Sequence, residues 1–144
     1  MPTLFLLLAA CDNHSEPEAT HAEHAEHAEH GAPSVLTLPL NDGARWQMDP
    51  HTRETVELTR TTLTEATVTD AASGRALSVT LQGQLDQLIS GCTMTGADHD
   101  ALHGFLTVYI PAVQALQAVT DDASATAQFT ALRAMVAESD RFFE

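Results

Sequence analysis

From position 49 onward the apolar residues recur at helical spacing in four stretches, which short polar breaks separate. The second stretch is the clearest, because its apolar residues follow one another at intervals of three or four and therefore share one face of a helix. These residues are Leu77, Leu81, Leu85, Leu88 and Cys92. Four amphipathic stretches of this kind predict an all-α fold.

The first two predicted helices have recognisable starts. Asp49 is a favourable N-cap and Pro50 fits the first helical position, so the first helix is expected to begin there and to extend toward Val68. Its many threonines weaken its intrinsic propensity, so packing must stabilise it. The second helix is expected to start in the polar break that precedes Leu77, with Ser73 as a candidate cap, and to end near Gly91.

The third and fourth helices begin at acidic or hydroxyl residues. Thr95 and Asp98 have the spacing of a capping box, which predicts a helix with Thr95 as its N-cap. Asp121 and Asp122 end that helix and begin a fourth, which is expected to reach almost to the carboxyl terminus. Because the connections are short, consecutive helices should run antiparallel. The sequence therefore predicts an antiparallel up-down four-helix bundle over residues 49–144.

A short extended segment and a polar tail precede the predicted bundle. Residues 35–48 begin with alternating apolar and polar side chains and continue through a turn at 41–43. They are expected to lie along the helices, with Trp46 covering a groove. Residues 11–34 have almost nothing apolar to bury and repeat His, Ala and Glu, which predicts a disordered His/Glu-rich linker.

The linker has two interpretations. It is a spacer that holds the bundle away from a membrane, or it is a tail whose imidazoles and carboxylates collect Zn(II), Cu(II) or Ni(II) in exchanging geometries. The candidate tail ligands are His14, His21, His24, His27 and His30.

Residues 1–10 resemble the end of a bacterial lipoprotein signal peptide, with Leu8-Ala9-Ala10-Cys11 as the lipobox. The resemblance implies cleavage before Cys11, a lipid on its sulfur, and a protein anchored in the cell envelope that faces the periplasm or the outside. No basic residue precedes the apolar run, which is short for a signal peptide, so the true start is expected upstream. The alternative is a soluble protein whose start is apolar by chance.

The chain is strongly acidic, with 20 Asp and Glu against 6 Arg, no Lys and a net charge of −14. This charge argues against nucleic acid and anionic lipid surfaces as partners and suits a protein that meets cations. The sequence also contains no Ser-His-Asp order, no Gly-rich phosphate loop and no C-x-x-C-H motif for covalent haem. No enzymatic activity is therefore predicted.

Four side chains that can bind a metal fall within the twelve residues from Cys92 to His103. His99 and His103 are four residues apart, the spacing with which two imidazoles on one helix chelate a metal. Cys92 and Met94 lie just before this helix, and thiolate, thioether and imidazole together suit Cu(I) better than Zn(II). The partial positive charge of a helix start favours thiolate over thiol and neutral imidazole over imidazolium. A purely structural interpretation stays open, with the two sulfur residues in the core and the histidines in solvent.

The predicted topology adds two candidate ligands. In an up-down bundle the chain that leads into the first helix lies at the same end as the turn between the second and third helices. Met48 and His51 could therefore join Cys92, which would be the single thiol of the mature chain if Cys11 is lipidated.

Three groups of residues from position 36 onward carry a resemblance to a known family. They are Leu36-Thr37-Leu38 with Asn41-Asp42-Gly43; Trp46-Gln47-Met48-Asp49 with Arg53; and Cys92-Thr93-Met94-Thr95-Gly96 with His99, Leu102 and His103. They resemble a family of small secreted or lipid-anchored bacterial helical-bundle proteins of uncharacterised activity. The resemblance implies a bundle in the cell envelope, often with a His-rich segment after the signal, and implies no particular activity.

Two functions from different classes are compatible with these features. The first is an envelope lipoprotein that binds a transition metal, copper before zinc, for buffering, delivery or resistance. The second is a membrane-tethered interaction module that docks another envelope protein and has no metal site in its folded domain. Non-covalent haem is a third and less favoured choice, because helical bundles host haem readily.

Overall fold

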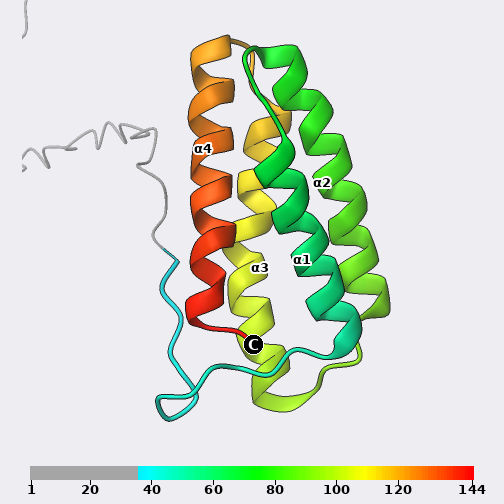
Figure 1. Ribbon diagram of the computed structural model, residues 1–144, viewed down its shortest axis with the longest axis vertical. Coiled ribbons are helices and arrows are strands. Elements are labelled where there is room, and N and C mark those ends of the chain that lie inside the picture. Colours follow the sequence, from blue (N-terminus) through cyan, green and yellow to red (C-terminus); the bar gives the residue numbers. More distant parts are fainter. Residues whose placement is uncertain (1–35) are drawn as a thin grey trace, which may run out of the picture.

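The computed structural model describes residues 36–144, which form four helices packed into an up-down bundle (Figure 1). The helices are α1 (Pro50–Glu65), α2 (Ala71–Gly91), α3 (Gly96–Gln117) and α4 (Asp122–Glu138), and a short 3-10 helix, η1 (Ser139–Arg141), follows. The predicted all-α four-helix bundle is therefore confirmed. None of the described helices combines the length and the apolar character needed to cross a membrane.

The apolar stripes predicted from the sequence form the core. Leu81 in α2, Leu102 in α3 and Leu132 in α4 are at most 2% exposed. Leu77 and Cys92, at the two ends of the predicted stripe in α2, are only partly buried against this core. The buried face of α2 therefore follows the helical period, but at its start it passes through Ala71, Gly74 and Ser78 with Leu77 beside it.

The four helices do not pack equivalently. α2 and α4 each pack against the other three helices, whereas α1 and α3 share few contacts. Small residues permit the approach of α2 to α4, because a Cβ added to Gly74 would lie 3.1 Å from the Cβ of Ala125. α2 and α4 therefore form the short diagonal of the bundle, and α1 and α3 form the long diagonal.

Two helix boundaries between α1 and α2 differ from the prediction. α1 ends at Glu65 and not near Val68, because the chain becomes extended at Ala66 (ψ 146°). α2 begins after Asp70, whose carboxylate accepts a hydrogen bond from the Ser73 N–H at 2.7 Å. The Ser73 hydroxyl oxygen accepts in return from the Asp70 N–H at 3.2 Å, so Ser73 completes a capping box and is not itself the cap.

The carboxyl-terminal end of the bundle also departs from the prediction. α4 stops at Glu138, and the last residues pair with the segment that leads into α1. The Trp46 N–H donates to the Phe142 carbonyl at 2.7 Å, and the Glu144 N–H donates to the Trp46 carbonyl at 2.9 Å. Trp46 is buried as expected, but it is held by the carboxyl terminus as well as by the helices.

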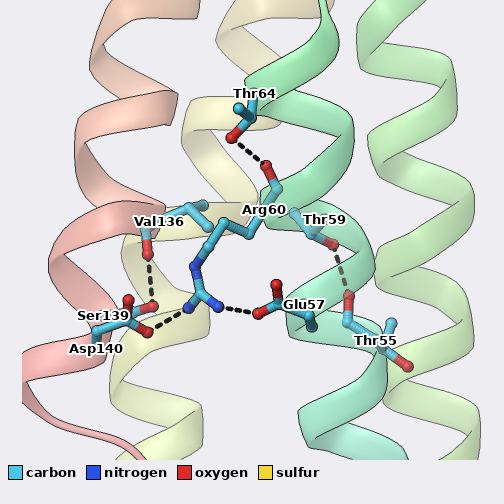
Figure 2. Close-up of polar contacts among 8 residues, drawn as sticks. All are labelled: Thr55, Glu57, Thr59, Arg60, Thr64, Val136, Ser139 and Asp140. Atoms are coloured by element: carbon cyan, nitrogen blue, oxygen red, sulfur yellow. Dashed lines mark hydrogen bonds and ion pairs between the residues drawn. The ribbon is translucent and has the colours of Figure 1, made fainter.

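Arg60 of α1 holds the turn that makes this pairing possible. Figure 2 shows its guanidinium between Glu57 of α1 and Asp140 of η1, with which it forms ion pairs. Ser139 caps the end of α4 by donating its hydroxyl proton to the Val136 carbonyl at 2.7 Å. The chain after α4 is therefore fixed to α1 by charge and to α4 by a hydrogen bond.

The buried face of α1 is unusual because threonine fills much of it. Thr52, Thr55 and Thr59 are at most 7% exposed. The Thr55 hydroxyl donates to the His51 carbonyl at 2.9 Å. The Thr59 hydroxyl donates to the Thr55 carbonyl at 3.0 Å (Figure 2). These bonds satisfy the hydroxyls of Thr55 and Thr59 in core positions, whereas the buried Thr52 hydroxyl has no hydrogen-bond partner among the described residues.

A matched pair of truncations tests the core. Leu81→Ala should lower the free energy of unfolding by about 2–5 kcal/mol, because Leu81 is fully buried. Leu58→Ala should cost less than about 1 kcal/mol, because Leu58 is 47% exposed. Urea denaturation followed by circular dichroism measures both changes, and equal costs would contradict the packing described above.

Candidate metal centre

Asp49 ties the start of α1 to the α2–α3 connection. One carboxylate oxygen accepts from the Thr52 N–H at 2.6 Å and so caps α1. The other accepts from the N–H of Thr93 at 2.6 Å and from its hydroxyl at 2.8 Å. Partial burial alone would raise the pKa of Asp49, but these hydrogen bonds outweigh it and hold the pKa well below its usual range. The segment leading into α1 and the α2–α3 connection therefore lie at one end of the bundle, as predicted (Figure 1).

Asp98, in the first turn of α3, makes a second link across this end. Its carboxylate accepts from the backbone N–H of Gln47 at 2.9 Å. Thr95 occupies the N-cap position as predicted but makes no side-chain capping bond, so the predicted capping box is absent. The chain enters α3 through Gly96 at φ 68°, whereas a capping box requires a helical conformation at that position.

Cys92, His99 and His103 lie in a row at this end. The Cys92 Sγ is 3.8 Å from the His99 Nδ1. The rings of His99 and His103 are 4.4 Å apart between centroids, with a tilt of 51° between their planes. Cys92 is partly buried and His103 is exposed, so the row leads from the edge of the core to solvent.

His51 lies against the last turn of α2. Its Nε2 is 2.9 Å from the Gln87 carbonyl oxygen. Because a carbonyl only accepts, Nε2 carries the proton and Nδ1 keeps the lone pair in the neutral ring. Histidines that bind metals commonly hold their second nitrogen in this way. Gly91 makes room for the ring, because a Cβ at this position would overlap it.

Met48 and Met94 have a different environment from the histidines. Both side chains are partly buried and pack against the apolar core. The backbone N–H of Met48 donates to the Glu144 carbonyl at 2.9 Å, which fixes the chain beside its thioether. The two methionines therefore supply an apolar border to the end of the bundle on which Cys92 lies.

Within residues 36–144, no three side chains of His, Cys, Asp or Glu are arranged to hold one metal ion. Cys92 contacts His99 and His99 contacts His103, but His51 stands on α1, across the long diagonal from α3. Soft donors in pairs suit Cu(I), which is stable with fewer ligands than the tetrahedral set of a structural zinc site. Cys11 and the tail histidines, His14, His21, His24, His27 and His30, lie outside the described residues.

Comparisons with models of protein families, with curated proteins and with solved structures found no match. The resemblance to small bacterial bundle proteins therefore rests on the sequence patterns quoted above, and it stays a prediction.

Gly91 was not recognised as a site residue from the sequence, and a pair of glycine substitutions tests its role. Gly91→Ala should turn the His51 ring away from the Gln87 carbonyl and cost about 1 kcal/mol of stability. Gly83→Ala should stabilise the protein by about 0.5–1 kcal/mol, because Gly83 lies in the same helix with open space around it. Urea denaturation and NMR signals of the His51 ring measure both effects. In a His51→Ala background, Gly91→Ala should lose its cost.

Acid titration of stability tests Asp49. A carboxylate whose pKa is lower in the folded than in the unfolded protein stabilises the fold fully above about pH 4, the usual pKa of Asp, and loses this contribution as the pH falls. The difference in stability between wild type and Asp49→Asn should therefore be constant from pH 8 to pH 5 and shrink below about pH 4. Urea midpoints measured across this range report it. A difference that grows on acidification would contradict the described hydrogen bonds.

Proposed function

We propose that this protein is an envelope lipoprotein that binds a transition metal, Cu(I) in preference to Zn(II), for buffering, delivery or resistance. The observation that carries the proposal is the contact between the Cys92 thiol and the His99 imidazole at the end of the bundle. A thiol and an imidazole in contact beside the start of a helix form a pair of donors that a soft ion prefers.

Four further residues are candidate donors to the same ion. His103 already stacks on His99 and is exposed, so rotation of its side chain brings a second imidazole to the same ion. Met94 follows Cys92 by two residues and supplies a thioether from the apolar side. Met48 and His51 are outer candidates that depend on movement at the start of α1.

The proposed location and tail come from the sequence. Lipidation at Cys11 would tether the bundle to an envelope membrane, and the tail histidines would collect metal close to the bundle. The net charge of −14 favours a high local concentration of cations around such a protein.

A second candidate function has its own support. Leu58 of α1 and Val79 and Ile89 of α2 are 47%, 65% and 53% exposed, and a partner protein that covered α1 and α2 would bury them. A membrane-tethered interaction module would use these residues and would need no metal.

A Cu(I) competition titration separates the two functions. The chain from residue 34 onward, folded by circular dichroism, is titrated anaerobically under reducing conditions against a chromogenic chelator. One tight equivalent is expected, and the variant with Cys92, Met94, His99 and His103 changed to Ala should lose it. Asp100→Ala, an exposed change in the same turn of α3, is the matched control and should bind as wild type does. Absence of tight binding in the folded wild-type chain would reject the copper site and leave the interaction module.

A further inference from the structure

We infer that Asp49 and Asp98 form a reciprocal clasp that positions Cys92 and His99 for their shared ligand, an inference that rests on the proposed metal site. Each aspartate is adjacent in sequence to one candidate metal ligand. Each also accepts a hydrogen bond from a residue that is adjacent to a different candidate ligand. Asp49 follows Met48 and holds Thr93, which lies between Cys92 and Met94.

Asp98 completes the reciprocal arrangement from the opposite side. It precedes His99 and accepts from the N–H of Gln47, which precedes Met48. The two links run in opposite senses between the same two segments, 47–49 and 92–99. Together they fix the position of the connecting turn on which Cys92 stands relative to the helix on which His99 stands.

The other helix caps show that this arrangement is not required for capping alone. Asp121 caps α4 through the N–H of Ser124 at 2.9 Å and its hydroxyl at 2.7 Å, all within one turn. Asp70 caps α2 through Ser73 in the same local manner. Among the aspartate N-caps of residues 36–144, only Asp49 uses one oxygen for its own helix and the other for a segment 44 residues away in sequence. Asp122, in the first turn of α4, also links two helix starts by accepting from the Ala71 N–H at 2.9 Å, but no second carboxylate in the described part of the chain reciprocates that link.

The clasp holds a connection that belongs to neither helix. α2 ends at Gly91, and Cys92 is its C-cap with an extended backbone (ψ 125°). Cys92 and the residues from Thr93 to Thr95 therefore lie in the connection between α2 and α3, outside both helices. Three hydrogen bonds to residues 47–49 hold this connection instead. Thr93 donates two of them to Asp49, and Gln47 donates the third to Asp98 of α3. Loss of the clasp should therefore free the Cys92 thiol from His99 while the bundle remains folded.

The test compares Asp49→Asn and Asp98→Ala with the matched cap variant Asp121→Asn. All three are made in the full chain with Cys11→Ser, so that Cys92 is the single thiol. The Cu(I) dissociation constant is measured by chelator competition, and the rate of Cys92 alkylation by iodoacetamide is measured without metal. Thermal unfolding of each variant shows how much general stability is lost.

The clasp variants should weaken Cu(I) binding by about 10–100-fold, as loss of residues that orient metal ligands does. They should also change the alkylation rate of Cys92 several-fold, whereas Asp121→Asn should lower the unfolding temperature without either effect. If Asp98→Ala and Asp49→Asn behave as Asp121→Asn does, the clasp is rejected. A wild-type protein that binds no Cu(I) but whose Cys92 responds to the clasp variants would reject the metal function and retain the positioning role. If Asp49→Asn does not fold, Thr93→Val, which removes one of the Asp49 bonds, takes its place with the same expectations.

Discussion

The carboxylate of Asp49 is the interaction on which the organised end of this bundle depends. It satisfies an orphan N–H at the start of α1 and, with its second oxygen, holds the connection between α2 and α3. One charged group thus fixes the start of α1 relative to the α2–α3 connection, which carries Cys92. Because the hydrogen bonds hold the pKa of this carboxyl well below its usual range, the constraint persists through neutral and mildly acidic pH.

The fold could be predicted because its information is local. The stripe from Leu81 to Leu88 and the caps at Asp49 and Asp121 are recognisable in a few consecutive residues, and the structure places them as expected. The pairing of Trp46 with Phe142 could not be predicted, because it joins segments almost a hundred residues apart and leaves no periodic signal. The end of α4 was misplaced for the same reason, since the residues after Glu138 are taken into that pairing.

The candidate site was predictable only in part. Helical spacing correctly placed His99 and His103 on one face, and the topology correctly brought the start of α1 to the same end. It did not show that α1 and α3 occupy the long diagonal, or that the His51 ring packs against Gly91 and the Gln87 carbonyl at the end of α2. Gly91 also carried no signal, because the need for a missing side chain is visible only when the His51 ring is seen beside it.

The threonines inside α1 have a consequence for the thermodynamics of the whole bundle. Exposure of apolar surface raises the heat capacity of unfolding, and exposure of polar surface lowers it. A helix that buries Thr52, Thr55 and Thr59 where other bundles bury leucine adds less to this quantity. The stability of this protein should accordingly change less steeply with temperature than that of a leucine-lined bundle of equal size.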